Sequence, residues 1–515
     1  MDERILALVD MGTSKIALTI AKIQGDNTEV LYYRECPSEG IRYGSVVNPM
    51  KAGGRLKEAL AQAEEELNIK ITQVVIGMPR SSVKQESIPG QIIRPDSFSC
   101  ITQEEVDSLK NIALDDYPLD DSQREEIYGS IAQSFTADDM IHASEEDIVG
   151  IPSEKLEGNF KVFVGPKRPV DNIYHMLNRL GVGVARRFFT PEAVGKAVLT
   201  RDESENGVGV IDFGAGVTSV SIFQGGILRY YSSIPFGGKT ITSDIKYECG
   251  VREVLAENIK LAFGACLPDK LQTLADKIIQ INNDEDGSYQ QLPVKYLSEI
   301  ITSRVHEIFQ AILFLIQQSG YADKLRCGLV ITGGSANLVN CANMLKDESG
   351  YTVRVGAPRT RHFSADSHVD MNRLSAATSA GLLLLAREDE HLNCVESAAG
   401  TKPEAAEEVP ETEPVDIPEE KIEQGRDIDD MLSDLMPKGR GSQKPAPQPV
   451  IGKVQKPVRE PEPEKKQAQS KREARKEEKK EPEAVKRVII WGKKLKDVLE
   501  GAFDTTLGDN YDHMQ

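Results

Sequence analysis

Two short segments of this 515-residue chain combine an aspartate with glycines and hydroxyl residues, the groups needed to hold a phosphorylated ligand. The segments are Asp10-Met11-Gly12-Thr13-Ser14-Lys15 and Asp212-Phe213-Gly214-Ala215-Gly216-Val217-Thr218. Glycine lets the backbone approach an anion closely, and amide and hydroxyl groups can donate to phosphate oxygens. Each aspartate follows an apolar run, where a carboxylate could hold magnesium through its waters. One such segment is weak evidence, because Asp and Gly are common in the turn after a strand. Two of them predict a phosphate site and an internal duplication.

A third segment has the same design. The apolar run Leu329–Ile331 leads through Thr332 into Gly333-Gly334-Ser335-Ala336, followed by an apolar helix start. In order and spacing, the three segments resemble the phosphate-1, phosphate-2 and adenosine motifs of the actin, sugar-kinase and chaperone superfamily. Ordinary tight turns are the alternative for each segment taken alone. The resemblance implies an ATP site, with Mg²⁺ held by two aspartates.

Further segments narrow the resemblance to one family. Asp10-Met-Gly-Thr-Ser-Lys-Ile16, Gly237-Gly238 with Thr242-Ser243-Asp244-Ile245, and Ala256-Glu257-Asn258-Ile259-Lys260 are similar to the bacterial cell-division FtsA family, over about residues 1–386. The resemblance implies that Gly238 approaches the terminal phosphates and that Glu257 and Lys260 flank the adenosine. A solvated helix face is the alternative for the last two. The residues thus expected at the nucleotide are Gly12, Thr13, Ser14, Lys15, Gly214, Ala215, Gly216, Val217, Thr218, Gly238, Glu257, Lys260, Gly333, Gly334 and Ser335, and those expected at the metal are Asp10 and Asp212.

Departures from the family pattern bear on hydrolysis. Ala215, Val217 and Ser219 stand where relatives usually have a third glycine and a final aspartate in the second phosphate loop. Efficient hydrolases of the superfamily place an acidic or amide residue near the start of the helix at Pro191 to orient water, and the matching residue here is Thr190. Glu192 is close in sequence, but a helix turns its side chain away from that position. We therefore name no catalytic residue and expect tight ATP binding with at most weak ATPase activity.

The elements that must position these loops follow from the hydrophobic pattern. Short apolar runs predict buried strands, and longer stretches of helical periodicity alternate with them. This alternation predicts an α/β protein, and the resemblance implies a two-lobed actin-like (ribonuclease H-like) fold. The expected strands are Ile5–Val9, Val74–Ile76, Val208–Ile211 and Leu329–Ile331, and the clearest helices are Leu56–Leu67 and Val305–Gln317.

An insertion interrupts the first lobe. The stretch from about 81 to 165 fits the subdomain, called 1C, that the family carries in place of actin's subdomain 1B. Thr102 and Glu105 have capping-box spacing, and Asp147-Ile148-Val149-Gly150 precedes an expected strand at Phe160–Val164. An unrelated α/β insertion is the alternative. The expected division is lobe 1 at 1–80, 166–200 and 361–386, subdomain 1C at 81–165, lobe 2 core at 201–241 and 325–360, lobe 2 outer subdomain at 242–324, a disordered charged linker at 387–482, a membrane-targeting helix at 483–504 and a tail at 505–515.

Composition limits the function classes. The 62 basic and 81 acidic residues give a formal charge of −19, which disfavours general nucleic-acid binding. Seven scattered cysteines without a CxxC pair indicate neither a disulfide framework nor a zinc site and fit the reduced cytosol. The first residues lack the basic start and apolar core of a signal peptide. No apolar run approaches the length of about 18 residues that spans a bilayer, so we expect any membrane contact to be peripheral.

The expected linker contains no aromatic residue and is rich in Glu, Asp, Lys and Pro. Such a segment cannot bury enough apolar surface to offset its ordering entropy. One acidic patch at 428–436 differs, because its apolar residues recur at helical spacing. They are Ile428, Met431, Leu432, Leu435 and Met436. The patch is either a transient helix without consequence or a short motif that folds on a partner.

The segment from Glu483 to Asp504 has the pattern of an amphipathic helix that lies in a membrane interface. Between Val485 and Phe503, five basic against two acidic residues leave about 3 kcal/mol of attraction to an anionic surface, before burial of the apolar face. Gly492 lowers the stability of this helix by about 1 kcal/mol, so we expect one copy of the segment to bind the membrane marginally. Many copies in a filament would bind well. A helix that docks on the folded body or in a partner's groove is the alternative. The residues expected at the membrane are Val485, Lys486, Arg487, Val488, Ile489, Trp491, Lys493, Lys494, Leu495, Lys496, Val498, Leu499 and Phe503.

Together these features favour an ATP-binding cytoskeletal adaptor of bacterial cell division. The resemblance implies self-association into protofilaments, binding of the FtsZ C-terminal peptide on residues 242–324, contact with other division proteins and with anionic lipids, and no nucleic-acid partner. It also implies a peripheral position on the inner face of the cytoplasmic membrane at the division site. A small-molecule kinase of the same superfamily is the main alternative. A chaperone and a pilus-assembly homologue fit less well, because the former needs a β-rich peptide-binding domain and the latter lacks an amphipathic terminus.

Overall fold

The computed structural model describes residues 3–25, 27–94, 96, 98–115, 117–142, 144–282, 289–359, 363–365 and 371–395. All of them belong to one unit of the chain, Met1–Ala399 with Pro482–Gln515, and the second unit, Gly400–Glu481, lies outside the described residues. The acidic patch at 428–436 and the amphipathic segment at 483–504 lie outside them as well. Among the described helices, none is both long and apolar enough to cross a bilayer.

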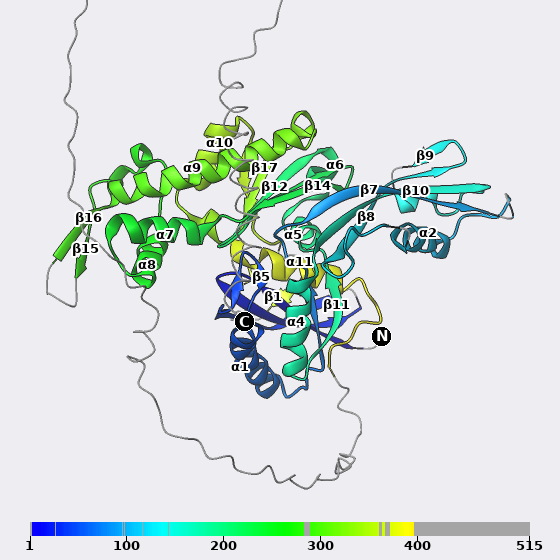
Figure 1. The fold of residues 1–515 in the computed structure, drawn as a ribbon, viewed down its shortest axis with the longest axis horizontal. Coiled ribbons are helices and arrows are strands. Elements are labelled where there is room, and N and C mark those ends of the chain that lie inside the picture. The colour runs from blue at the N-terminus through cyan, green and yellow to red at the C-terminus, as the bar shows by residue number, and fades with distance from the viewer. Residues whose placement is uncertain are drawn as a thin grey trace, which may run out of the picture. The chain divides into compact units, whose positions relative to one another are not determined.

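Lobe 1 is built on a six-stranded sheet with the order β11-β6-β1-β2-β3-β19. The strands β1, β2 and β3 are antiparallel neighbours, whereas β6 runs parallel to β1 and β11 parallel to β6. Helices α1 and α4 lie on one side of this sheet, and α5 and α11 lie between it and the sheet of lobe 2 (Figure 1). The bounds are β1 Arg4–Met11, β2 Lys15–Gln24, β3 Asn27–Pro37, β4 Ile41–Arg42, β5 Ser45–Val46, α1 Pro49–Leu67, β6 Gln73–Gly77, α4 Lys167–Arg179, β11 Gly183–Phe188, α5 Thr190–Val198, β19 Ser364–Ala365 and α11 Ala377–Ala386.

Lobe 2 repeats this topology on a five-stranded sheet, β14-β13-β12-β17-β18. Its first three strands are again antiparallel neighbours, and β17 and β18 are again parallel additions. The repeat agrees with the duplication that the two aspartate loops indicated. The bounds are α6 Arg201–Asn206, β12 Val208–Phe213, β13 Thr218–Gln224, β14 Ile227–Ile234, α7 Gly238–Cys249, α8 Glu253–Phe263, β15 Ile278–Asn282, β16 Tyr289–Pro293, α9 Val294–Gln318, β17 Leu329–Thr332, α10 Cys341–Ser349 and β18 Val353–Val355.

The strands expected from apolar runs are all present and are buried on both faces. In β12, for example, each residue from Val208 to Phe213 is buried. One face of this strand packs toward α5 and lobe 1, and the other packs with Phe213 against Phe309 of α9. Continuous burial explains why these strands have apolar runs and not the alternation of a half-exposed strand.

Residues 387–395 correct the linker boundary expected at 387. This segment is part of the folded unit, since Leu392 and Cys394 are buried. The amide of Cys394 donates to the Ile5 carbonyl at 2.8 Å, and its carbonyl accepts from the Thr72 amide at 3.0 Å. Local charge suggested a linker here, whereas these long-range backbone bonds to β1 and to the residue before β6 hold the segment against lobe 1.

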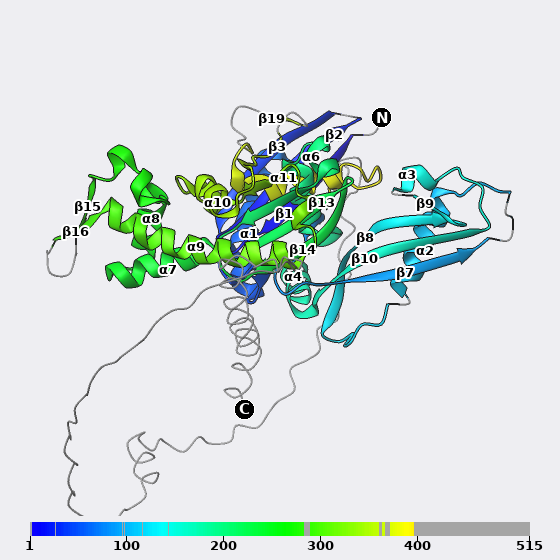
Figure 2. The same cartoon turned by 90° about the horizontal axis from the view of Figure 1, so that it is seen from above.

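The inserted subdomain has a four-stranded sheet, β7-β10-β8-β9, and a hydrophobic core of its own. Helix α2 packs on this sheet through Val106, Leu109 and Ala113. In Figures 1 and 2 this subdomain and the α7–α8 region lie on opposite sides of the two central sheets. The bounds are β7 Lys84–Ile93, α2 Gln103–Asp115, β8 Glu125–Ala137, β9 Met140–His142, α3 Glu145–Ile148 and β10 Lys155–Pro166.

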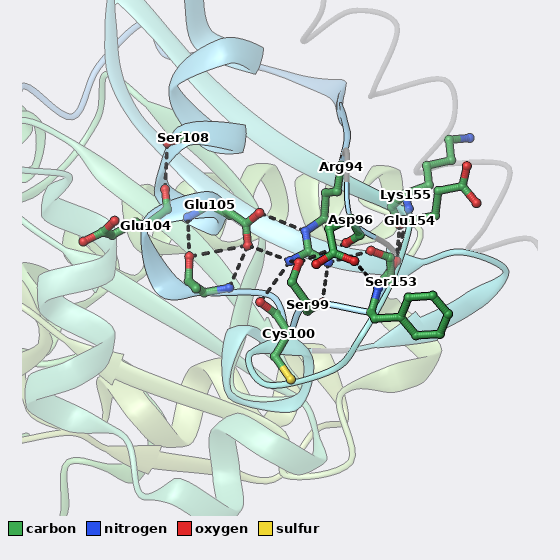
Figure 3. A network of polar contacts seen from close by, with 12 residues as sticks. Arg94, Asp96, Ser99, Cys100, Glu104, Glu105, Ser108, Ser153, Glu154 and Lys155 are labelled. Carbon is green, nitrogen blue, oxygen red and sulfur yellow. Dashed lines mark hydrogen bonds and ion pairs between the residues drawn. The ribbon is translucent and has the colours of Figure 1, made fainter.

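Arg94 organises one end of the inserted subdomain (Figure 3). Its guanidinium is buried and donates to the carbonyls of Ser99 and Ser153 and to both carboxylate oxygens of Glu105. The Glu105 carboxylate also accepts from the Thr102 amide at 2.9 Å, and the Glu105 amide donates to the Thr102 hydroxyl at 3.3 Å. The predicted capping box of α2 is therefore confirmed, and Arg94 fixes it to the surrounding loops.

Candidate functional site

The three glycine loops meet at one cavity of about 720 Å³ between the lobes. The carboxyl ends of the parallel strands β1, β6, β12 and β17 point to this cavity, which is where open α/β sheets bind ligands. All the residues expected at the nucleotide and the metal line it except Thr218. The side chain of Thr218 is fully buried, and its hydroxyl donates to the Phe236 carbonyl at 2.8 Å, so it supports the loop from behind.

The two aspartate loops have the same backbone closure. The Gly12 amide donates to the Lys15 carbonyl at 2.9 Å, and the Gly214 amide donates to the Val217 carbonyl at 3.0 Å. A Cβ at either glycine would lie 2.8 Å from that carbonyl oxygen, so only glycine fits this turn. The tight closure brings the start of the next strand back beside each aspartate, which places Asp10 and Asp212 at the cavity wall.

The third loop packs directly on the second. Gly333 has φ +89°, and a Cβ there would lie 2.5 Å from Oδ1 of Asp212. Ser335 donates to the Gly214 carbonyl at 2.9 Å, and a Cβ at Gly238 would lie 2.4 Å from the Ser335 hydroxyl. Helix α7 begins at Gly238, so its amino terminus, where anions are favoured, opens beside these loops.

Glu257 and Lys260 line the cavity from α8. The Lys260 ammonium donates to Glu257 and Thr242 at 2.8 Å and to the Gly238 carbonyl at 2.9 Å. Burial lowers the pKa of this ammonium, which the neighbouring carboxylate opposes. The structure thus excludes a solvated position for Lys260, whereas 34% of the Glu257 side chain is exposed. Leu261 and Leu338 also line this end of the cavity, beside Lys260.

Thr242 and Asp244 connect α7 to its neighbours. Thr242 bonds the Gly238 carbonyl at 2.9 Å and the Glu257 carboxylate. Asp244 accepts from Nε and Nη2 of Arg304 on α9, at 2.6 and 3.0 Å. The family-specific run Thr242–Ile245 therefore orients α7, with Ile245 in the core beneath it.

Arg80 is the principal residue of this cavity that the sequence did not reveal. It follows β6, and its guanidinium donates to Asp212, while Nη2 lies 3.9 Å from Oδ1 of Asp10. Burial raises the pKa of Asp10, and the charge of Arg80 opposes that rise. An arginine beside a proline carries no periodic signal, and its partner is 132 residues away in the chain. No local pattern could therefore have identified it.

The same aspartates were expected to hold magnesium. Magnesium keeps several waters and needs only one or two carboxylates beside the phosphates, so the residue types would suffice. The guanidinium of Arg80, however, lies between the two carboxylates, where the ion would have to bind. As arranged, the two carboxylates hold an arginine and do not fit a metal ion.

Neither Thr190 nor Glu192 lines this cavity. Thr190 is buried, and its hydroxyl donates to the Met78 carbonyl at 2.7 Å. Glu192 lines a separate cavity of about 240 Å³ beside Phe135 and Leu228, where burial raises the pKa of its carboxyl group. Neither residue is oriented to position water at the glycine loops.

Comparison with known proteins agrees with this architecture. Residues 209–381 match the family model described as cell division protein FtsA. The chain is 30% identical over 399 residues to the cell division protein FtsA of Borreliella burgdorferi, covering 76% of this chain and 93% of that one. It is 28% identical over 360 residues to the FtsA of Neisseria meningitidis serogroup B, covering 69% and 84%. A chain of the solved PilM-PilN type IV pilus biogenesis complex has a similar fold, with a TM-score of 0.52 at 14% identity over 74% of this chain and 98% of that one. The chain therefore belongs to the FtsA family of cell division proteins and has the family's two-lobed actin-like α/β fold.

Proposed function

We propose that this protein binds ATP between its lobes and acts as an actin-like adaptor in bacterial cell division. The observation that carries the proposal is the convergence of the three glycine loops and the start of α7 on one cavity. Such loops and a helix amino terminus offer many backbone amides to phosphate oxygens. Membership of the FtsA family supports the cellular role.

The cavity has the two chemically different ends that a nucleotide needs. At one end lie the two aspartate loops with Lys15, Lys239 and Arg80, which suit a polyphosphate. At the other lie Glu257, Lys260, Leu261 and Leu338, which offer hydrogen-bonding groups and an apolar wall to a nucleoside.

ATP in this proposal joins the lobes and is hydrolysed slowly. The Lys239 ammonium of α7 donates to the Thr13 carbonyl of lobe 1 at 3.0 Å, and Gly216 packs against Thr13. A ligand that binds both loops would strengthen this contact and favour closed protomers. We expect slow turnover because neither Thr190 nor Glu192 lines the cavity, so neither can act as a base toward water at the phosphates.

Closed protomers would then associate into protofilaments, as the family relationship suggests. The outer subdomain at 242–324 would hold the FtsZ C-terminal peptide, and other division proteins would join the assembly. The amphipathic segment at 483–504, which lies outside the described residues, would attach the filament to anionic lipids on the inner face of the membrane at the division site. Many weak anchors in one filament add through effective concentration.

The test of ATP binding uses a variant that fills the cavity without straining the fold. A Cβ at Gly334 would meet only Ser375 Cβ, at 3.9 Å, so Gly334→Leu should fold while its side chain occupies nucleotide space. Gly54→Leu is the matched control, since a Cβ there has nothing within 4 Å. With a fluorescent ATP analogue, wild type and Gly54→Leu should bind alike, and Gly334→Leu at least tenfold more weakly.

Equal binding by all three proteins, or none by the wild type, would contradict the proposal. Phosphoryl transfer from ATP to common sugars distinguishes the adaptor from the small-molecule kinase. The adaptor predicts no transfer above a protein-free blank.

A further inference from the structure

Arg80 is held in place by two sets of contacts from lobe 2. Its carbonyl accepts from the Tyr231 hydroxyl at 2.5 Å and from the Ser233 hydroxyl at 2.9 Å, both on β14. Its guanidinium bonds Asp212 on β12. The two donors fix the backbone of Arg80, and the bond to Asp212 holds its guanidinium at the phosphate end of the cavity.

Arg80 is the cation that lies close to both Asp10 and Asp212, whereas the lysines of the cavity have other partners. Lys15 is paired with Glu35, and Lys260 with Glu257, while Lys239 donates to a backbone carbonyl of lobe 1. Arg80 lies against Asp212 and within 3.9 Å of Asp10. All three of these side chains are largely buried, with 18% of Arg80 and 9% of each aspartate side chain exposed.

A buried pair of carboxylates repels an incoming polyphosphate unless a positive charge lies between them. A divalent cation can supply that charge, and so can a guanidinium, which stays protonated and can bind phosphate with two parallel N–H groups. Here the guanidinium already lies between the carboxylates. Its Nη2 is too far from Asp10 for a hydrogen bond, so N–H donors remain for phosphate oxygens.

We propose that Arg80 is a built-in cation of the phosphate end, which lets this protein bind a nucleoside triphosphate with little dependence on magnesium. The proposal rests on the ATP-binding function above and adds a positioning residue to it. Arg80 neutralises the two aspartates and presents its remaining donors to the phosphates. Without Arg80, the carboxylates would regain the need for a divalent cation.

The experiment measures binding of a fluorescent ATP analogue to the full chain in magnesium and in EDTA. The readout is the ratio of Kd in EDTA to Kd in magnesium. For the wild type and for Arg186→Gln, whose arginine pairs with Asp389 away from the cavity, the ratio should stay below about 3, a difference of less than 0.7 kcal/mol. For Arg80→Gln the ratio should rise at least threefold above the wild-type value.

A second measurement uses the metal alone and needs no nucleotide. Magnesium should leave the thermal midpoint of the wild type unchanged and raise that of Arg80→Gln, because the variant frees two carboxylates for the ion. A wild-type ratio above 3, or an unchanged ratio in Arg80→Gln, would overturn the proposal. Absence of binding in both buffers would instead contradict the ATP-binding function, so the two failures are distinguishable. If Arg80→Gln does not fold, the wild-type ratio alone decides.

Discussion

The two phosphate loops contact each other through Gly216 and Thr13. Because of this contact, we expect Gly216→Ala to destabilise the fold, whereas the same substitution at Gly54 should stabilise it. A Cβ at Gly216 would lie 2.6 Å from Oγ1, 2.7 Å from Cγ2 and 3.0 Å from Cβ of Thr13, so Gly216→Ala must force the loops apart. Overpacking of this kind costs about 1–3 kcal/mol. In Gly54→Ala, by contrast, the new methyl meets nothing within 4 Å on α1, and helix propensity stabilises by about 0.5–1 kcal/mol.

Thermal unfolding followed by circular dichroism measures the effect. A change of 1 kcal/mol shifts the midpoint by about 2–4 °C in a domain of about 150–250 residues. Gly216→Ala should therefore lower it by about 2–12 °C, and Gly54→Ala should raise it slightly. The double variant Gly216→Ala, Thr13→Ala removes two of the three clashing atoms. Its loss should be smaller than the sum of the single losses by about 1 kcal/mol. Equal midpoints for Gly216→Ala and Gly54→Ala, or strictly additive losses, would refute the packing of Gly216 on Thr13.

Arg304→Met breaks the bidentate pair with Asp244 and should destabilise the outer subdomain by about 1–3 kcal/mol. The measurement is the midpoint of the transition that exposes α7, which should fall. An unchanged midpoint would contradict a stabilising role for this pair. Hydrogen bonds from Arg94 lower the pKa of Glu105, so the folded-state pKa lies below the unfolded one. The stability from this pair is therefore present above about pH 4.5 and lost as pH falls through the folded pKa, and Glu105→Gln should flatten that part of the stability profile. In liposome co-sedimentation with ATP, a truncation before Glu483 should stay in the supernatant while the full chain pellets, and equal pelleting would disprove the tether.

Much of the framework could be predicted because it is encoded locally. The buried strands β1, β6, β12 and β17 appear in the sequence as continuous apolar runs, and the capping box of α2 appears as a fixed spacing between Thr102 and Glu105. The glycine loops were recognisable because glycine at those positions is required by backbone geometry.

The remaining features depend on contacts between distant residues. Lysine is usually solvated on a helix, and the burial of Lys260 depends on the carbonyl of Gly238, the hydroxyl of Thr242 and the carboxylate of Glu257. Residues 387–395 have the charge of a linker and are held by backbone bonds to lobe 1. The role of Arg80 depends on its partners on β1, β12 and β14. These partners are distant from Arg80 in the sequence, so no short stretch of the chain contains them together.

We propose that ATP joins the two lobes and is hydrolysed slowly. The most direct test incubates the full chain with radiolabelled ATP, separates the protein and identifies the nucleotide that remains bound over time. We expect stoichiometric binding, with most of the nucleotide recovered as ATP after many seconds. Absence of bound nucleotide, or turnover near the enzyme median of about 10 per second, would contradict it.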